Sequence, residues 1–527
     1  MNLYKDGQLI LRLIINFIFV LSISMDVLAQ TPIILDANDL YQANCSSCHG
    51  VDRLGGVGPA LLPGNLERLR RSEAIKTIAN GRLATQMPQF GEKLSSSDIA
   101  SLVDYIYTPL KKIPSWGIKE IQASRVNFPG SNFINKPIFS ADPLNLFIVV
   151  EVGDHHVTIL DGDTFNAIAR FPTRYALHGG PKFSSDGRYV YFASRDGWIS
   201  KYDIWNLQFV AEVRAGINTR NLAVSSDGRY VMVANYFPHT LVALDAKDLS
   251  PISIIEAKDK SGKTSRVSAV YDAAPRKSFV VAFKDIPEVW EIAYGGKDSN
   301  IQTGLVHDFR MGELVPSKEM FPMRRIKLDD YLDDFFFDPN YDHVIGSSRE
   351  GRGQVINLNV GQKIAEIGLP GLPHLGSGIS WDYMGKSVMA TPNLKDGIVT
   401  VIDMKSWTVV KQIPTLGPGF FMRSHEMTPY AWVDAFNDPK NHDVIQLIDK
   451  QTLEVAHRIR PSPGKVAAHT EFTRDGKYAL VSIWENDGAL VIYDGKTLEE
   501  IKRIPMNKPS GKYNIFNKIT RSEGTSH

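Results

Sequence analysis

The chain has 527 residues, of which 43% are hydrophobic and 22% are charged. This length is sufficient for two or more domains, and the composition is that of a globular protein. The formal net charge of +1 gives no field of one sign, so the sequence does not predict a nucleic acid or an anionic membrane surface as a partner. Because the chain has two cysteines, a disulfide framework is excluded.

The N-terminal segment has the pattern of a signal peptide. Positive charges flank an apolar run that extends to Met25, and small residues lead to Ala29, as they do before a signal-peptidase site. The run is too short to span a membrane comfortably, and Asp26 ends it. We therefore expect residues 1–29 to be removed on export, leaving a periplasmic protein without a membrane span.

The stretch "CSSCH" contains both cysteines of the chain, and a histidine directly follows the second one. A zinc site would need about four ligands, and the sequence has no second C-x-x-C pair. A thioredoxin-like redox pair would lie in a βαβ pattern, which is also missing. The stretch is the attachment pattern of a c-type haem, in which Cys45 and Cys48 form thioethers and His49 ligates the iron.

The sequence after this motif is typical of a small cytochrome. Met87 lies beside Pro88, which prevents a helix there, and its thioether would ligate the second face of the iron; the alternative is a core methionine. The next segment predicts a helix with one apolar face, formed by Ile99, Leu102, Val103 and Ile106. We expect residues 30–111 to form an all-α domain similar to a class I cytochrome c. Residues 112–135 show no sustained period and are interpreted as a linker.

From residue 136 onward, one unit of three or more short strands recurs. Clear copies begin at Phe183, Val224 and Phe472, each with an Asp-Gly turn, an alternating strand, and a second strand that ends in aspartate. Weaker copies begin near Phe139, Val270, Phe336, Ser380 and Met427. Eight such units predict an all-β, eight-bladed β-propeller over residues 136–527, with a wide central channel.

Five residues are candidates for the wall of that channel. His178, His374 and His469 each lie close to the predicted innermost strand of a unit, where the chain lines the mouth of the channel. Arg195 and Arg220 fall in one half of the ring, and the forked guanidinium group of arginine binds carboxylates well. The alternative is three separate loop histidines and two arginines in surface ion pairs.

An N-terminal cytochrome c followed by an eight-bladed propeller resembles the cytochrome cd1 family over nearly all of the mature chain. The resemblance is strongest in "LHGGPKFSSDGRYVYFASRDG", "LPHLGSGISWD" and the tail "KPSGKYNIFNKITRSEGTSH". It implies one covalent haem c in the first domain and haem d1, a carboxylate-rich macrocycle, in the propeller. His178 matches the position of the proximal iron ligand, and Arg195 and Arg220 match arginines that hold the carboxylates.

The chain departs from the nitrite reductases of that family at one position. Those enzymes place two histidines on the distal side of the iron to protonate nitrite. His374 matches one of them, but the other falls in a segment resembling "DYLDDFFFD", where this chain has Asp333. An ionised aspartate is a poor proton donor, so this departure argues against nitrite reduction.

The tail and His469 are more similar to another group in the family, the dihydro-haem d1 dehydrogenases of haem d1 biosynthesis. This resemblance implies an oxidoreductase that converts a propionate of dihydro-haem d1 into the acrylate of haem d1. We expect His374 to be the base and Tyr513 to hydrogen-bond or relay a proton, unless Tyr513 is a core residue of the ring-closing strand. His178 or His469 would ligate the substrate iron, and the sequence leaves that choice open.

The implied reaction releases two electrons, whereas one haem c takes up one. An external one-electron acceptor is therefore an expected partner, together with the cytochrome cd1 nitrite reductase or another protein of haem d1 maturation. Two other functions stay open at this stage. One is a nitrite reductase that uses His374 with a different acid, and the other is a non-catalytic carrier of haem d1.

Overall fold

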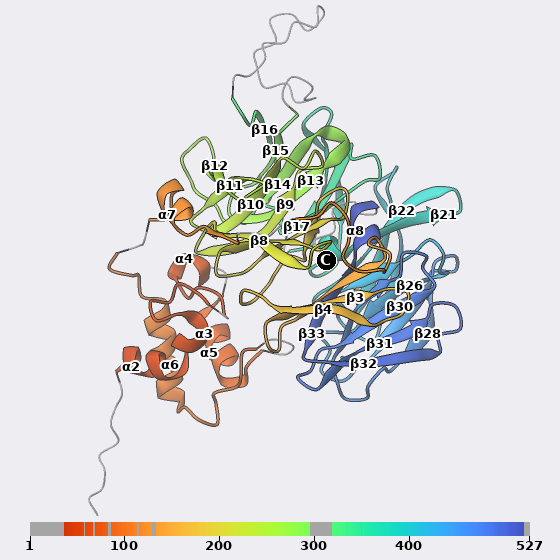
Figure 1. Cartoon of the computed structure of the whole chain (residues 1–527), viewed down its shortest axis with the longest axis horizontal. Coiled ribbons are helices and arrows are strands. Elements are labelled where there is room, and N and C mark those ends of the chain that lie inside the picture. Colours follow the sequence, from red (N-terminus) through yellow and green to blue (C-terminus); the bar gives the residue numbers. More distant parts are fainter. Residues whose placement is uncertain are drawn as a thin grey trace, which may run out of the picture.

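The computed structural model describes residues 36–520 except 57, 67–68, 83–85, 113–114, 129–132, 296–318 and 349. The predicted signal peptide lies outside the described residues. Figure 1 shows a helical body, coloured red to orange, beside a ring of β-sheets that runs from yellow to blue. Among the described helices, none has the length and apolar character needed to cross a membrane.

The helical body has the predicted all-α architecture. Its described helices are α2 (Ala37–Asn44), α3 (Ser46–His49), α4 (Pro63–Leu66), α5 (Arg71–Asn80) and α6 (Ser96–Ile106). The apolar face predicted for α6 is buried against α2 and α5, and their side chains form one core. A capping box starts α6: the Asp98 N–H donates to Ser95 Oγ (3.1 Å) and the Ser95 N–H donates to Asp98 Oδ2 (3.0 Å).

The segment between the two bodies is more ordered than its sequence predicts. It contains α7 (Ile118–Ala123) and β1 (Val126–Asn127), and β1 pairs antiparallel with strand β8 of the propeller. The Gly117 N–H donates to Glu120 Oε2 (2.8 Å), and Trp116 Nε1 donates to Arg214 O (2.8 Å). A six-residue helix is too short to display a 3.6-residue period, which is why a pattern search does not find it.

Eight antiparallel sheets form the ring, as the repeats predict. Blade 1 combines β33 (Pro509–Asn514), β2 (Leu146–Glu151), β3 (His156–Asp161) and β4 (Ala167–Pro172). Blade 2 has β5 (Lys182–Phe183), β6 (Tyr189–Ala193), β7 (Trp198–Asp203) and β8 (Gln208–Arg214), with β1 outside them. Blade 3 has β9 (Asn218–Val224), β10 (Tyr230–Phe237), β11 (Thr240–Asp245) and β12 (Pro251–Glu256). Blade 4 has β13 (Val267–Ala273), β14 (Ser278–Phe283), β15 (Glu288–Ala293) and β16 (Met323–Lys327).

The second half of the ring repeats this order. Blade 5 has β17 (Asp334–Phe337), β18 (His343–Ser347), β19 (Arg352–Asn357) and β20 (Gln362–Gly368). Blade 6 has β21 (Ile379–Tyr383), β22 (Lys386–Pro392), β23 (Ile398–Asp403) and β24 (Thr408–Pro414). Blade 7 has β25 (Met422–Ser424), β26 (Tyr430–Asp434), β27 (Ile445–Asp449) and β28 (Glu454–Ile459). Blade 8 has β29 (Ala467–Phe472), β30 (Tyr478–Ile483), β31 (Gly488–Asp494) and β32 (Glu500–Met506), and α8 (Ile515–Thr520) follows β33.

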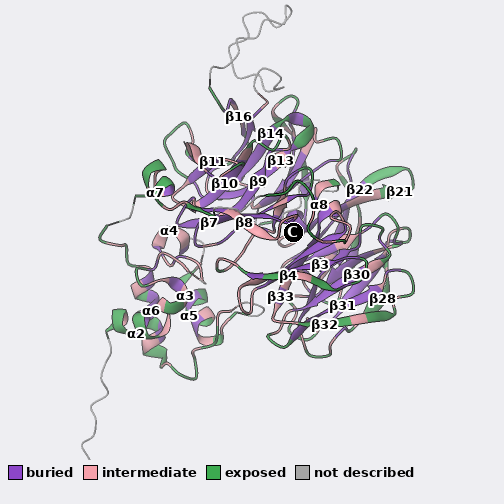
Figure 2. Cartoon of the chain, in the orientation of Figure 1, coloured by how far each residue is buried: buried purple, intermediate pink, exposed green. Residues whose placement is uncertain are grey.

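The two ends of the propeller sequence share one sheet, which closes the ring. Strand β33 pairs with β2, so that Val149 lies opposite Lys512 and Ile148 lies opposite Tyr513. The inner strands are buried between neighbouring blades, while several outermost strands are exposed, as Figure 2 shows in purple and green. Closure hides the sheet edges and fixes the segments that enter the innermost strands.

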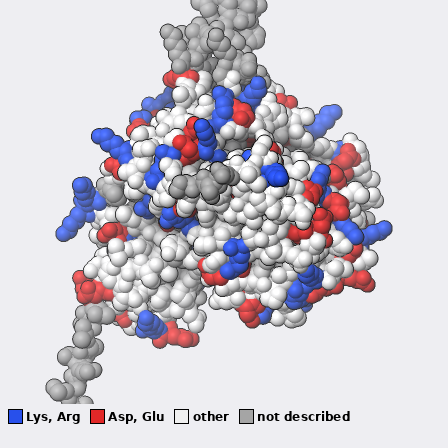
Figure 3. Space-filling model, viewed as in Figure 1, with Lys and Arg blue, Asp and Glu red and all other residues white. Residues whose placement is uncertain are grey.

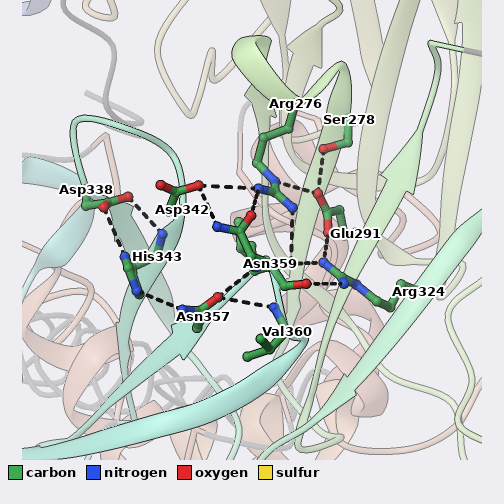
Figure 4. Close-up of polar contacts among 11 residues, drawn as sticks. Arg276, Ser278, Glu291, Arg324, Asp338, Asp342, His343, Asn357, Asn359 and Val360 are labelled. Atoms are coloured by element: carbon green, nitrogen blue, oxygen red, sulfur yellow. Dashed lines mark hydrogen bonds and ion pairs between the residues drawn. The ribbon is translucent and has the colours of Figure 1, made fainter. Parts of the chain in front are cut away.

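A buried charge network joins blades 4 and 5 on the outer side of the ring (Figure 4). Arg276 Nε donates to Glu291 Oε1 (2.7 Å), while Arg276 Nη1 donates to Asn359 Oδ1 (2.7 Å) in the next blade. Arg324 also pairs with Glu291 and bonds the Leu358 carbonyl. The Glu291 side chain is 0% exposed, so two arginines share one buried carboxylate, and Asp342 lies 3.8 Å from Arg276.

Replacing Glu291 with glutamine is expected to lower the free energy of unfolding by about 3–5 kcal/mol, because two cations lose their buried counter-charge. Chemical denaturation of the purified protein measures this change. Glu366→Gln is the matched control: its side chain is 57% exposed and pairs with Lys363 at 3.3 Å, so we expect a change within about 0.5 kcal/mol. Equal effects of the two substitutions would contradict this account of the network.

Candidate functional site

The C-x-x-C-H motif lies where α2 passes into α3, beside the core of the helical body. Cys45 and Cys48 are free thiols and half-buried. His49 is buried, and its Nδ1 lies 2.7 Å from Pro59 O, which fixes Nδ1 as the donor and leaves Nε2 to ligate a metal. Burial lowers the pKa of His49, so the ring is neutral, as a ligand must be.

The loop that faces His49 requires glycine. A Cβ on Gly58 would lie 2.5 Å from His49 Cε1, so a side chain there would displace the imidazole. Met87 lies on the loop after α5, is half-buried, and packs against the core of the helical body. These residues fit a covalent haem c held by Cys45, Cys48 and His49, with Met87 as the candidate second ligand.

The loop that carries Met87 also reaches the propeller. The side-chain amide of Gln86 donates to Val152 O in blade 1. The Arg82 N–H donates to Met87 O (3.1 Å), and the charge of Arg82 contributes to lowering the pKa of Arg195 in blade 2. The loop of the candidate haem c ligand thus lies close to blades 1 and 2.

His178 and Arg220 form a hydrogen-bonded pair in the channel. His178 Nδ1 lies 2.8 Å from Arg220 O, and Arg220 Nη1 lies 2.7 Å from His178 Nε2. The first contact makes Nδ1 the donor, so Nε2 carries the lone pair. Arg220 Nη1 also lies 3.1 Å from Nδ1, so the guanidinium lies against the imidazole ring and not along that lone pair. Burial, with the charges of Arg195 and Arg220, holds the pKa of His178 well below its usual value, and the ring is neutral.

Arg195 and Arg220 belong to this cluster, in which the cations outnumber the carboxylates. Burial, together with the neighbouring charge of Arg220, lowers the pKa of Arg195 to about 10. Lys284, 4% exposed, ion-pairs with Asp333 nearby. On the face shown in Figure 3, acidic and basic side chains are interspersed. An excess of cations around His178 is suited to a ligand with several carboxylates.

His374 enters the channel from blade 6. Its Nδ1 lies 2.7 Å from Phe420 O, which makes Nδ1 the donor and leaves Nε2 with the lone pair. The ring packs on Phe420, with 4.3 Å between ring centroids. Burial lowers the pKa of His374, and Arg220 adds to this effect, although Asp334 opposes it. The ring is therefore neutral near pH 7, and the same arginine influences His178 and His374.

His469 is the third residue of β29, whereas its sequence position predicts a place just before that strand. Two residues, His469 and Thr470, stand opposite Val481 in β30, which is a β-bulge. The bulge gives His469 a left-handed backbone with φ of +53°, and its side chain is 2% exposed. Neither ring nitrogen has a hydrogen-bond partner among the described residues. A strained, buried and unpaired histidine is typical of a functional site.

Tyr513 lies beside His469, on the strand that closes the ring. The two rings meet edge to face with 5.0 Å between centroids, and Tyr513 is 5% exposed. Burial raises the pKa of Tyr513, so the phenol keeps its proton. Gly511 leaves the room for this hydroxyl, since a Cβ there would lie 2.6 Å from the Tyr513 oxygen.

A second group of cations surrounds Tyr513, and the sequence reading did not identify it. Burial lowers the pKa of Lys182 to about 8 and the pKa of Lys512 well below its usual value. Arg423 Nε lies 3.6 Å from Glu471 Oε2, and Lys518 Nζ lies 5.4 Å from the centre of the Tyr513 ring. These residues come from blades 2, 7 and 1 and from α8, so sequence spacing gave no signal for them.

Both predicted domains match known families. The family described as "Cytochrome D1 heme domain" matches residues 141–312 and 314–518, and "Cytochrome C oxidase, cbb3-type, subunit III" matches residues 34–106. The "Dihydro-heme d1 dehydrogenase" of Pseudomonas aeruginosa is 57% identical over 490 residues, which are 93% of this chain and 95% of that protein. The chain belongs to the dihydro-haem d1 dehydrogenase family.

A solved structure and a second relative agree with this family. The structure of "Dihydro-heme d1 dehydrogenase NirN in complex with DHE" matches with a TM-score of 0.78 and 56% identity, covering 92% of this chain and 100% of that one. The "Nitrite reductase" of Stutzerimonas stutzeri is 24% identical over 540 residues, 91% of this chain and 92% of that protein. The predicted fold, a cytochrome c domain followed by an eight-bladed propeller, is confirmed.

Within this dehydrogenase family fold, Asp333 takes part in an ion pair rather than in a pair of distal acids. Its carboxylate contacts the ammonium group of Lys284, and its N–H donates to Ser347 O (2.8 Å). An ion-paired carboxylate has no proton to give to nitrite. The geometry at this position is consistent with a dehydrogenase rather than a reductase.

Proposed function

We propose that the protein oxidises dihydro-haem d1 to haem d1 in the periplasm. One propionate side chain loses two hydrogen atoms, so its CH2–CH2 unit becomes the CH=CH unit of an acrylate, and two protons and two electrons leave. The observation that carries this proposal is the meeting of neutral histidines with several cations in one channel, in a chain that also carries the haem c motif. His374, His469 and Lys284 are buried, and His178, Arg195 and Arg220 are half-buried. Neutral histidines can accept protons, and the cations can hold carboxylates.

Arg195 and Arg220 are the proposed carboxylate clamp, and His178 is the proposed ligand of the substrate iron. His178 is preferred over His469 because a backbone carbonyl anchors its Nδ1, the arrangement that orients metal-ligating histidines. The Arg220 guanidinium lies against the His178 ring, with Nη1 2.7 Å from Nε2 and 3.1 Å from Nδ1. A substrate carboxylate is a stronger partner for that guanidinium. Carboxylate binding would therefore release His178 for the iron.

His374 is the proposed base, because it is neutral and its Nδ1–H is held by Phe420 O, so Nε2 can take a proton. Tyr513, protonated and in contact with His469, is proposed to hydrogen-bond the reacting side chain or relay a proton. The His469–Tyr513 contact places a second proton acceptor beside the phenol, which matches a reaction that releases two protons.

The anchored Nδ1 of His374 is equally compatible with a role as a second iron ligand. The two roles predict different spectra for the His374→Ala variant. Loss of a base slows the conversion and leaves the absorption spectrum of bound dihydro-haem d1 unchanged. Loss of a ligand shifts that spectrum on binding, before any conversion.

Haem c, when bound, takes up and passes on one electron at a time. The protein's own contribution is to hold that group close to the substrate, because the Met87 loop lies close to blades 1 and 2 and Gln86 bonds Val152. We propose an external one-electron acceptor as a partner, and the cytochrome cd1 nitrite reductase or another haem d1 maturation protein as the recipient of the product.

The pH dependence of turnover follows from the lowered pKa of His374. A base acts in its unprotonated form, and burial keeps the pKa of His374 below 6.5, so the active form persists as the pH falls towards that value. We expect kcat to be flat between about pH 6.5 and 8 and to fall at lower pH. A fall in kcat with a midpoint at or above 6.5 would contradict the assignment.

The proposal is tested by incubating the purified protein with dihydro-haem d1 and an oxidant under anaerobic conditions. Appearance of the haem d1 spectrum with repeated turnover supports the dehydrogenase. Unchanged bound dihydro-haem d1 identifies a carrier. Sustained nitrite consumption by protein loaded with haem d1 identifies a nitrite reductase and rejects the proposal.

A further inference from the structure

Asp434 lies at the end of β26 in blade 7, between the blades that carry His374 and His469. Its side chain is 1% exposed and faces backbone donors rather than a cation. Its Oδ1 accepts from the Phe420 N–H (2.7 Å) and the Phe436 N–H (3.3 Å), and its Oδ2 accepts from the Phe421 N–H (3.1 Å). A carboxylate with three backbone donors holds the segments that carry these donors in one position.

One branch of these contacts ends at His374. Phe420 is held by Asp434 through its N–H and holds His374 through its carbonyl, which lies 2.7 Å from His374 Nδ1. The Phe420 ring also packs on the imidazole. The backbone at Gly419 approaches the backbone of Asp434 closely, since a Cβ on Gly419 would lie 2.6 Å from Asp434 O. The orientation and tautomer of His374 therefore depend on where Asp434 places residue 420.

The other branch ends at His469. Its backbone is left-handed, a conformation that costs energy in a residue other than glycine and persists where the surroundings fix it. Phe421, held by the same carboxylate, packs on the His469 ring with 4.8 Å between centroids.

We infer that Asp434 is a positioning residue that sets the relative placement of His374 and His469 across three blades of the propeller. It does not touch the substrate. It acts through the backbone of residues 420 and 421, and Phe421 in turn packs on the His469 ring. This inference rests on the function proposed above, because it assigns a purpose to the geometry of that site.

The test is the isosteric variant Asp434→Asn. Its amide oxygen still accepts from Phe420, but its NH2 group faces the Phe421 N–H, so one branch is lost while the volume is kept. We expect kcat for dihydro-haem d1 to fall between about tenfold and 100-fold, since displacement of a reacting group by about 1 Å has effects of this size. The dissociation constant of dihydro-haem d1 should change by less than about threefold, because the carboxylate clamp is untouched.

Asp449→Asn is the matched control. Asp449 lies in the same blade and accepts from the backbone N–H groups of Gln451 and Thr452 (2.8 Å each), but it has no connection to either histidine. The kcat of this variant should stay within about twofold of wild type. The control therefore separates the positioning role from the general effect of losing a carboxylate that accepts backbone hydrogen bonds.

The outcomes separate this inference from the proposed function. Failure of the wild-type protein to convert dihydro-haem d1 rejects the function. If the wild type converts it and the two variants have equal kcat, the positioning role is wrong. If Asp434→Asn no longer binds dihydro-haem d1, or its propeller unfolds while the haem c spectrum persists, Asp434 is a folding residue and the inference is overturned.

Discussion

The His374→Ala variant is expected to turn over dihydro-haem d1 about 10²–10⁴-fold more slowly than the wild type, the usual contribution of a positioned general base. The imidazole is buried and neutral, and its Nδ1 is fixed by Phe420 O, so Nε2 is a ready proton acceptor. Alanine removes that acceptor and leaves the cations of the channel in place. The measurement is single-turnover conversion, followed by absorption spectroscopy, with substrate saturating.

His457→Ala provides the matched control for this substitution. His457 is exposed on strand β28, and its Nε2 lies 3.1 Å from the Tyr430 hydroxyl, away from the channel. We expect its conversion rate to equal that of the wild type. A His374→Ala protein that converts substrate within about threefold of the control rate would remove His374 from the proton-transfer step.

The Arg220→Ala variant is expected to bind dihydro-haem d1 about 10- to 100-fold more weakly, because a hydrogen bond to a charged group contributes about 1.5–3 kcal/mol. The guanidinium lies against His178 and Ser268 O, with its Nε 3.2 Å from that carbonyl. We propose that it turns to a substrate carboxylate on binding. Titration of the protein with dihydro-haem d1, followed by its absorption, gives the dissociation constant.

Two further variants make this prediction specific. Arg220→Lys keeps the charge but not the fork, so its affinity should lie between those of the wild type and the alanine variant. Arg229→Ala removes an exposed arginine that pairs with Asp227, and its affinity should match the wild type. Equal affinities for Arg220→Ala and Arg229→Ala would show that Arg220 does not hold the substrate.

The parts of the fold that repeat could be predicted from the sequence. The Asp-Gly turns and alternating strands mark the blades, and the apolar spacing of Ile99, Leu102 and Val103 marks the face of α6 that is buried. His178 and His374 precede innermost strands in the structure, as their sequence positions indicate. Local periodicity determines these features, so a single sequence shows them.

Features that depend on pairing between distant segments could not be predicted in this way. The bulge at His469 follows from the register of β29 against β30, which the residues of β29 do not encode by themselves. The cations around Tyr513 meet only after β33 closes the ring. The contacts of Asp434 are made to the backbone N–H groups of Phe420, Phe421 and Phe436, for which side-chain patterns give no signal.

The central claim is most directly tested by one anaerobic turnover of dihydro-haem d1 on the fully oxidised protein, with a one-electron oxidant present to take up the second electron. The tetrapyrrole is then extracted and analysed by mass spectrometry. The account predicts a product lighter by two hydrogen atoms, an absorption spectrum of haem d1, and reduction of haem c during the reaction. Recovery of the tetrapyrrole with unchanged mass, from wild-type protein that has bound it in the channel, would contradict the account and leave a carrier.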